Sequence, residues 1–487
     1  MRSLTLTTVA FLSLATATTA GQDAVAVVAS ASRAMGVDAL TSIHVTGVAQ
    51  NGNLGQNNNA NQPWPMAGAN DYVRAIDFSQ PSSRAMWTTF AVPVTGGAAA
   101  LGQGQQLITP QTTAWAQQLE IWITPWGFLK GAAINAASVR AQTSGGRRTQ
   151  IVTWSPPAKA PSGQSYRVVG YINAENLVER VQTWVEHPMF GDMLVDTEYS
   201  HYRDNNGLKY PTQIVQRRGG WPFFEAYLLS AFGNPANIQQ LLAAPAAGPA
   251  PVAPPAAPAA APPTLAASEQ LADGVFRIRG AYNALAVAFA DHVVLFEPGP
   301  QNEARAQAII AETRRVIPNK PIRYGVISHH HFDHTSGLPA VVAEDITIVT
   351  PAVNKTFLES ILMAPRTLAP DSMSRSGRKP KVEGFTGDRR IFQDATRTFE
   401  VHVIKGLPHA DGLVVGYLPK ERILVYADMF NLPPANAPVP NPPVVGTRVF
   451  LENIERLKLD VDRIVSVHSL NPDRLTSVAD IRASLGR

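Results

Sequence analysis

A short segment of the sequence holds four side chains that can bind a metal ion: His329, His331, Asp333 and His334. It directly follows an apolar run that predicts a buried strand. Side chains two apart on an extended segment point to the same side, so His329 and His331 can chelate one ion. Asp333 and His334 fall where the chain turns into a predicted helix and can face a second ion. The spacing therefore predicts a dinuclear metal site, with a solvated His-rich turn as the alternative for this segment alone.

Three further candidate ligands each come at the end of a predicted strand. His409 follows strand 399–404, Asp428 follows strand 423–426, and His468 follows strand 464–467. Seen alone, Asp428 could cap a helix or turn, and His468 could be a hydrogen-bonded core histidine. Their shared position at strand ends favours one site that also includes the first cluster. His330 lies inside that cluster at the wrong parity, so we expect a structural role for it.

Composition limits the chemistry that the chain can perform. There is no cysteine, which excludes disulfides, Cys-ligated zinc, iron–sulfur clusters and thiol nucleophiles. Any metal must therefore be held by His, Asp or Glu. The 41 Lys and Arg residues exceed the 37 Asp and Glu residues by only four in a chain of 487, too little to create a strong field for a polyanion. Nucleic acid is not expected as a partner.

The patterns around the cluster predict an α/β domain over residues 267–487. Strand-like runs occupy residues 275–279, 285–289, 293–296 and 324–327. Residues 301–316 place their apolar side chains on one helical face, and the Gly299-Pro300 turn opens this helix. The cluster of candidate ligands begins directly after the last of these strands.

Residues 22–240 predict a second, mainly antiparallel β domain. One helical run at residues 23–35 is followed by β-branched and aromatic runs, which turn residues such as 204–207 separate. The Asn- and Gly-rich residues 50–62 predict a mobile loop. This domain resembles the curved sheets of periplasmic lipoprotein-carrier domains, and no motif in it assigns a role.

Two shifts in composition predict the domain boundaries and the export of the protein. Residues 1–20 combine Arg2 with an apolar stretch and small residues, which is typical of a secretory signal peptide, with a retained N-terminal anchor as the alternative. Residues 241–265 are almost wholly Ala and Pro and predict an extended linker. We therefore expect a periplasmic or secreted protein with no stable membrane span after removal of the signal.

The chain after the linker resembles the metallo-β-lactamase superfamily in the order and placement of these residues: Ser328 to His334, His409, Asp428 and His468. The resemblance implies an αββα sandwich with its metals at the edge between two sheets. It also implies two sets of ligands and a bridge: His329, His331 and His409 for the first ion, Asp333, His334 and His468 for the second, and Asp428 between them. One position departs from the family pattern, because Glu297 stands where an Asp usually ends an early strand.

The ligand types point to hydrolysis. Zinc held by neutral imidazoles lowers the pKa of bound water to about 7, and a pair of ions can hold the resulting hydroxide. We expect two divalent ions, with Zn²⁺ favoured, although iron or manganese also suits His and Asp ligands. Asp333 is the predicted catalytic residue, because it would orient the nucleophile as well as bind the second ion.

The resemblance leaves the substrate open, because members of the superfamily act on several classes of compound. Asp428 at the bridging position resembles the thioester, lactone and phosphodiester hydrolases more than the antibiotic-degrading members. Export argues against RNA processing, and the uncharged, Pro-rich residues 429–443 suit an apolar substrate body. An ester- or lactone-like small molecule is the favoured substrate. A β-lactam, or a catalytically silent binding protein of this fold, is the alternative.

Overall fold

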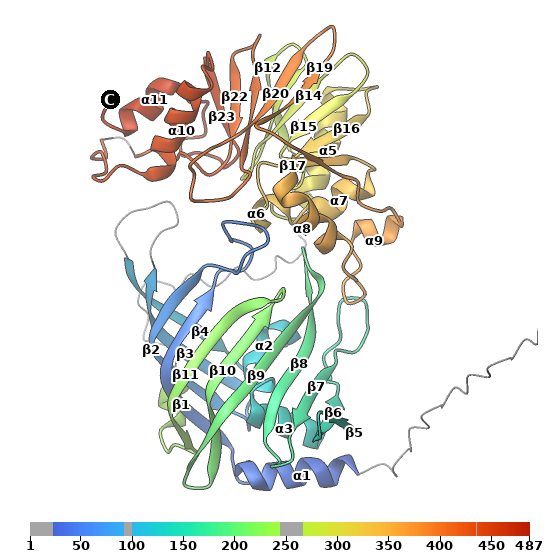
Figure 1. Ribbon diagram of the computed structural model, residues 1–487, viewed down its shortest axis with the longest axis vertical. Coiled ribbons are helices and arrows are strands. Elements are labelled where there is room, and N and C mark those ends of the chain that lie inside the picture. The colour runs from blue at the N-terminus through green and yellow to red at the C-terminus, as the bar shows by residue number, and fades with distance from the viewer. Residues whose placement is uncertain (1–22, 92–99, 244–265, 435) are drawn as a thin grey trace, which may run out of the picture.

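The computed structural model describes residues 23–91, 100–243, 266–434 and 436–487 (Figure 1). The predicted signal peptide lies outside these residues, and so does the predicted linker from residue 244 onward. Among the described helices, none combines the length and the apolar character needed to cross a membrane. Because the described residues do not include them, the signal peptide and most of the linker stay predictions.

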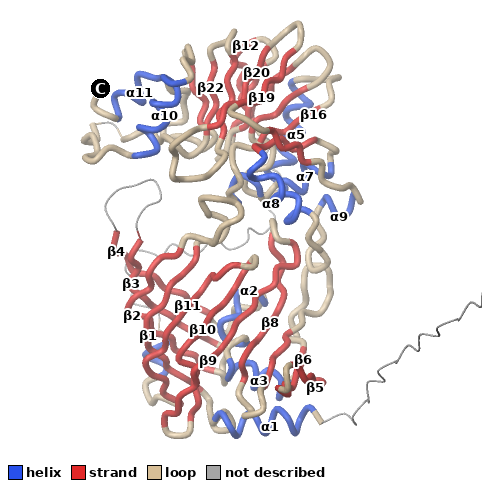
Figure 2. The backbone as a smooth tube through the Cα atoms, viewed as in Figure 1, coloured by secondary structure: helices blue, strands red, loops and turns tan. Residues whose placement is uncertain are grey.

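The N-terminal part is one large antiparallel sheet of eleven strands. Figures 1 and 2 show that this sheet is curved. The strands are β1 (Ser42–Gly52), β2 (Met66–Asp77), β3 (Ser82–Ala91), β4 (Ala100–Ile108), β5 (Ser138–Ser144), β6 (Arg147–Trp154), β7 (Val168–Ile172), β8 (Val178–His187), β9 (Gly191–Asn205), β10 (Leu208–Arg218) and β11 (Trp221–Gly233). Strand order is β4-β3-β2-β1-β11-β10-β9-β8-β7-β6-β5. The pairing of β1 with β11 joins the first four strands to the last seven, and the prediction of an antiparallel β domain is confirmed.

Four helices of the described residues pack against this sheet. They are α1 (Ala24–Met35), α2 (Trp115–Trp122), α3 (Pro125–Ile134) and the short α4 (Ile238–Leu242). Asp23 caps α1 by accepting from the backbone N–H of Val25, and Gly36 ends it at a φ of 71°. The helix predicted at residues 23–35 is thus confirmed. Because α2 contacts β3 and β8, which are far apart in the strand order, the sheet must curl around it.

The C-terminal part is a sandwich of two sheets. One sheet contains β12 (Ala267–Ala272), β13 (Val275–Arg279), β14 (Ala284–Ala288), β15 (Val293–Phe296), β16 (Ile322–Val326), β17 (Thr347–Pro351) and β18 (Val382–Phe385). The other contains β19 (Arg389–Gln393), β20 (Thr398–Val403), β21 (Val414–Leu418), β22 (Ile423–Tyr426) and β23 (Arg463–Ser466). Every residue of β14, β15 and β22 is buried, which explains why these strands read as unbroken apolar runs.

Helices form the outer layers of the sandwich. These are α5 (Glu303–Val316), α6 (Phe332–Thr335), α7 (Leu338–Ala343), α8 (Ala352–Leu362), α9 (Ser372–Ser376), α10 (Val445–Arg456) and α11 (Val478–Ser484). Ile309 of α5 packs in one core with the first sheet, and Phe450 of α10 packs in another core with the second sheet. A third core, which includes Phe296 and Phe399, lies between the sheets. The predicted αββα arrangement is confirmed.

The two parts of the chain are in direct contact. The Arg366 guanidinium donates to the backbone oxygens of Pro188 (2.7 Å) and Met189 (2.9 Å) in the turn between β8 and β9. In return, the Asp192 carboxylate accepts from the backbone N–H groups of Thr367 and Leu368. The sheet and the sandwich therefore meet through direct hydrogen bonds, of which those of Arg366 are at least half-buried.

Candidate metal centre

All seven predicted ligands lie in loops or short helices at one edge of the sandwich. His329 and His331 stand between β16 and α6, and Asp333 and His334 belong to α6. His409 lies between β20 and β21, while Asp428 and His468 follow β22 and β23 by two residues each. Because β22 and β23 pair in parallel, their carboxyl ends reach the same edge. The topology therefore gathers residues that are up to 139 positions apart in the sequence.

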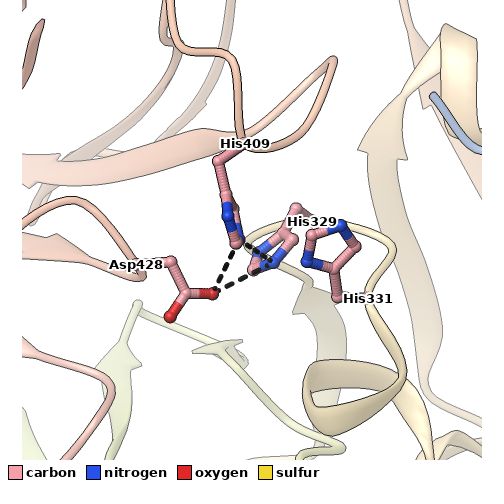
Figure 3. A group of neighbouring side chains, drawn as sticks. All are labelled: His329, His331, His409 and Asp428. Atoms are coloured by element: carbon pink, nitrogen blue, oxygen red, sulfur yellow. Dashed lines mark hydrogen bonds and ion pairs between the residues drawn. The ribbon is translucent and has the colours of Figure 1, made fainter. Parts of the chain in front are cut away.

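The first group consists of His329, His331, His409 and Asp428 (Figure 3). The Nε2 atoms of His329 and His409 are 3.3 Å apart, and they lie 3.1 and 3.3 Å from Oδ2 of Asp428. Two nitrogens bound to one tetrahedral zinc, each about 2.0 to 2.1 Å from it, would be about 3.3 to 3.4 Å apart. The spacing of these nitrogens fits a shared ion.

The second group consists of Asp333, His334, His468 and again Asp428. The Nε2 atom of His334 lies 2.8 Å from Oδ2 of Asp428 and 3.3 Å from Nε2 of His468. His468 in turn lies 2.5 Å from the other oxygen, Oδ1, of Asp428. The structure thus brings all seven predicted residues together, with Asp428 common to both groups. Their role as metal ligands stays a prediction.

The protonation state of His329 and His331 suits metal binding. His329 and His331 are at most 1% exposed, and burial, with the charge of His334 second, lowers the pKa of His329 to about 3. Its imidazole is therefore neutral and keeps a free lone pair at neutral pH. Nδ1 of His331 is buried and has no hydrogen-bond partner among the described residues. An orphaned buried nitrogen is costly unless it binds something, and a cation fits it.

Glu297 supports the second group from behind. Its Oε1 lies 3.0 Å from Nδ1 of His334, and its Oε2 accepts from the backbone N–H of Ser328. Glu297 is fully buried and has a φ of 65°, and Asp428 has a φ of 55°. Such left-handed backbone is uncommon for these residues and often marks functional sites. Glu297, although it replaces the usual Asp, therefore still places a carboxylate against the segment from Ser328 to His334.

Negative charge is concentrated around His334. Burial alone would lower the pKa of His334, but the carboxylates of Asp428, Glu297 and Asp333 raise it well above its ordinary value. Burial alone would raise the pKa of Asp428, but His334 and the other histidines bring it well below its ordinary range. Three carboxylates around one imidazole leave an excess of negative charge that a cation would neutralise. A metal at this group must displace a proton from His334, so metal binding weakens in acid.

Asp333 is held by two side chains that sequence reasoning missed. Gln56 Nε2 donates to its Oδ1 at 2.9 Å, and the Tyr282 hydroxyl donates to its Oδ2 at 3.0 Å. Burial and the Asp333 charge raise the pKa of Tyr282, so the phenol stays protonated and can donate. Burial alone would raise the pKa of Asp333 too, but His334 lowers it overall, which keeps Asp333 ionised. No spacing in the sequence signals Tyr282.

The loop at residues 53–65 is the other feature that the sequence did not reveal. Of the mobile loop predicted at residues 50–62, the start is wrong, because residues 50–52 belong to β1, whereas residues 53–62 do form a loop. Within it Gly55, Asn57 and Ala60 are buried. The backbone oxygen of Asn57 lies 2.8 Å from Nε2 of His330 and 3.0 Å from Nε2 of His331. His330 belongs to neither metal group, and this contact gives it a structural partner.

Comparison with known proteins places the sandwich. Residues 277–468 match a family model that is described as "Metallo-beta-lactamase superfamily". Similar solved structures include a metallo-β-lactamase from Pontibacter korlensis (16% identity, 45% of this chain and 97% of that chain, TM-score 0.34). A metallo-β-lactamase from Erythrobacter litoralis has 18% identity over 46% of this chain and 95% of that chain, with a TM-score of 0.33. The metallo-β-lactamase FIM-1 from Pseudomonas aeruginosa, in a mono-zinc form, has 14% identity over 46% of this chain and 94% of that chain, with a TM-score of 0.33.

No curated protein matches the chain. The family match contains, or ends on, every one of the seven residues, since it runs from β13 to His468. The superfamily includes metal-dependent hydrolases. The C-terminal half of the chain therefore matches the metallo-β-lactamase superfamily, over residues 277–468.

Proposed function

We propose that this chain is an exported, dinuclear metal-dependent hydrolase of ester- or lactone-like small molecules, periplasmic or secreted. One observation carries the proposal: the carboxylate of Asp428 is shared by both groups of candidate ligands, within 3.3 Å of nitrogens from each. A carboxylate that contacts imidazoles from two groups is suited to bridge two cations. A single-ion site would need only one of the groups.

The residues of the chain divide the work of hydrolysis. When bound, two divalent ions supply Lewis acidity toward a carbonyl oxygen and lower the pKa of water to about 7. Asp333, ionised and half-exposed, can accept a proton from the attacking water. Tyr282 and Gln56 hold its two oxygens in place, so the carboxylate cannot rotate away. Nδ1 of His334 is occupied by Glu297, which directs Nε2 toward the ion.

The surroundings of the site favour an uncharged substrate. In the described part of the chain, the outside side chains that hydrogen-bond the side chains of the seven residues are those of Gln56, Tyr282, Glu297 and Ser328, and none is cationic. Residues 429–443 carry no charge. Val439 and Val444, on or next to this loop, are 46% and 41% exposed. Phosphodiesters would need cationic partners, whereas an apolar ester or lactone needs only the metals and an apolar wall.

A substrate panel on the zinc-loaded full chain tests the proposal. The panel holds a hydrophobic lactone, an aryl ester, a β-lactam and an aryl phosphodiester, and metal content is measured on the same sample. We expect two ions per chain and turnover fastest on the lactone or ester. Asp428→Ala should abolish it, while His201→Asn, at an exposed histidine of β9, should not.

Three other results of the substrate panel would each favour a different function. Fastest turnover of the β-lactam would make the chain a β-lactam hydrolase and overturn the substrate class. Fastest turnover of the phosphodiester would overturn the argument from charge. Two bound ions with no turnover on any member would favour a silent binding protein of this fold.

A further inference from the structure

The loop at residues 53–65, which joins β1 to β2 in the N-terminal sheet, lies against both metal groups (below α6 in Figure 1). Gln56 contacts Asp333 of the second group, and the next residue, Asn57, contacts His331 of the first. Asn58 Nδ2 then donates to the backbone oxygen of Pro408, the neighbour of His409, at 2.7 Å. Three successive residues thus reach two of the four segments that carry candidate ligands, the one with His329 to His334 and the one with His409.

The carbonyl of Asn57 decides which nitrogen of His331 is free. A carbonyl oxygen only accepts hydrogen bonds, so the 3.0 Å contact with Nε2 requires the proton of the imidazole to be on Nε2. Nδ1 is then deprotonated, and it is the buried nitrogen that lacks a partner among the described residues. In metal sites, such an outer partner fixes the tautomer and the orientation of the ligand ring. The first group therefore depends on a backbone atom of the N-terminal part.

The side chain of Gln56 has the matching role toward the second group. Its amide nitrogen donates to Oδ1 of Asp333, while Tyr282 and His334 face Oδ2. Both carboxylate oxygens are therefore held, each from a different side. Because Gln56 is neutral, it orients Asp333 without competing with a cation for the negative charge.

The loop is built to keep this position. The buried Asn57 side chain donates to the backbone oxygens of Asn59 (2.6 Å) and Gln62 (3.1 Å), which closes the loop on itself. Gly55 has a φ of 80°, and a Cβ there would lie 2.3 Å from the ring of Phe332. Trp64, 2% exposed, packs edge-on against the same ring, with centroids 6.0 Å apart. Only a residue without a side chain at 55 allows this close approach.

We propose that this loop of the N-terminal part is a component of the metal centre: Gln56 is a positioning residue for Asp333, and the Asn57 carbonyl positions His331 for its ion. The inference rests on the proposed function and extends it. The metal centre is formed by both parts of the chain, and the curved sheet has a role in it that the family match, which begins at residue 277, does not cover.

Point variants in the full chain test this proposal. Gln56→Met keeps the size of the side chain and removes its donor. Gly55→Ala removes no polar group but forces the loop away from Phe332. Gln62→Ala is the matched control, because its side chain is exposed and its hydrogen bonds are made by its backbone. Affinities for both ions are measured by competition with a chromophoric chelator, and the absorption spectrum of the cobalt-substituted protein reports ligand geometry.

We expect Gln56→Met to weaken the binding of one ion by about 10- to 100-fold and to lower kcat more than it raises KM. Gly55→Ala should weaken both ions and change the cobalt spectrum, while Gln62→Ala should match wild type. A wild type that binds two ions and hydrolyses substrate, with both loop variants unchanged in affinity and spectrum, overturns this inference and leaves the proposed function standing. A wild type that binds no ions overturns both.

Discussion

The side chains of Glu297 and His334 form a fully buried pair, with Oε1 of Glu297 3.0 Å from Nδ1 of His334. The carboxylate contacts Nδ1, and Nε2 on the other side of the ring faces Asp333 and Asp428, where it could hold a metal ion. A negative partner at Nδ1 makes Nε2 a better donor to a metal and prevents the ring from turning. The pair therefore ties the strand end after β15 to the second metal group.

Replacing this carboxylate should weaken the second ion. Glu297→Gln keeps an acceptor oxygen for His334 but removes the charge, so we expect a loss of about 10- to 100-fold in affinity for one ion. Chelator competition measures it. Glu400→Gln is the matched control, because Glu400 also pairs with a histidine, His402, at 2.7 Å but outside the site. Equal losses in the two variants would contradict the special role of Glu297.

Asp333→Asn should remove most of the hydrolysis while the chain stays folded. An amide cannot accept the proton of water and is a poorer ligand than a carboxylate, so we expect a fall in kcat of at least about 100-fold. Steady-state kinetics on the ester or lactone, with circular dichroism as the test of folding, measure this. Asp388→Asn, at an exposed carboxylate paired with Lys405, is the control. Turnover equal to wild type in the folded, metal-loaded variant would remove Asp333 from the mechanism.

Asp428 should govern the number of ions bound. Since its oxygens face nitrogens of both groups, Asp428→Ala should reduce the metal content from two ions per chain to one or fewer. Elemental analysis after loading with zinc and removal of excess metal gives the number. Two ions retained by the variant would show that the groups do not share this carboxylate.

His187 should make the contact between the two parts sensitive to acid. Burial, together with the charges of Arg218 and Arg366, lowers its pKa to about 3. Its Nδ1 accepts from the backbone N–H groups of Met189 and Phe190, and its ring packs on Phe332. The unfolded chain binds this proton near pH 6.5 and the folded chain does not, so stability falls as the pH drops below 6.5.

For this one group the loss is up to about 3 kcal/mol between pH 7 and pH 4, and less where water reaches the ring. His187→Asn keeps an acceptor and cannot be protonated. Denaturant titrations of both proteins at pH 7 and pH 4 should show a smaller loss in the variant. An identical loss in both would mean that other groups cause the acid sensitivity.

The sequence predicted the sandwich, and it predicted that the candidate ligands meet at one edge, because these signals are local. Each ligand follows a short apolar strand, and parallel strands bring their carboxyl ends to one edge. The contacts of Tyr282 and Gln56 with Asp333 were not predicted, because neither residue has a ligand spacing or a periodicity that marks it. The Asn and Gly residues between 50 and 62 predict a mobile loop from composition alone. In the structure the same residues give tight turns, donors along the loop and, at Gly55, room for Phe332.

The hydrogen bond between Asn57 and His331 joins points of the chain that are 274 residues apart. Closing so long a loop costs entropy that only late, cooperative contacts repay. We therefore expect His331 to take its final position only after the sheet has folded and the loop that carries Asn57 has formed. A mutation that slows the folding of the sheet would then delay the completion of the first metal group, although the mutated residue lies far from its histidines.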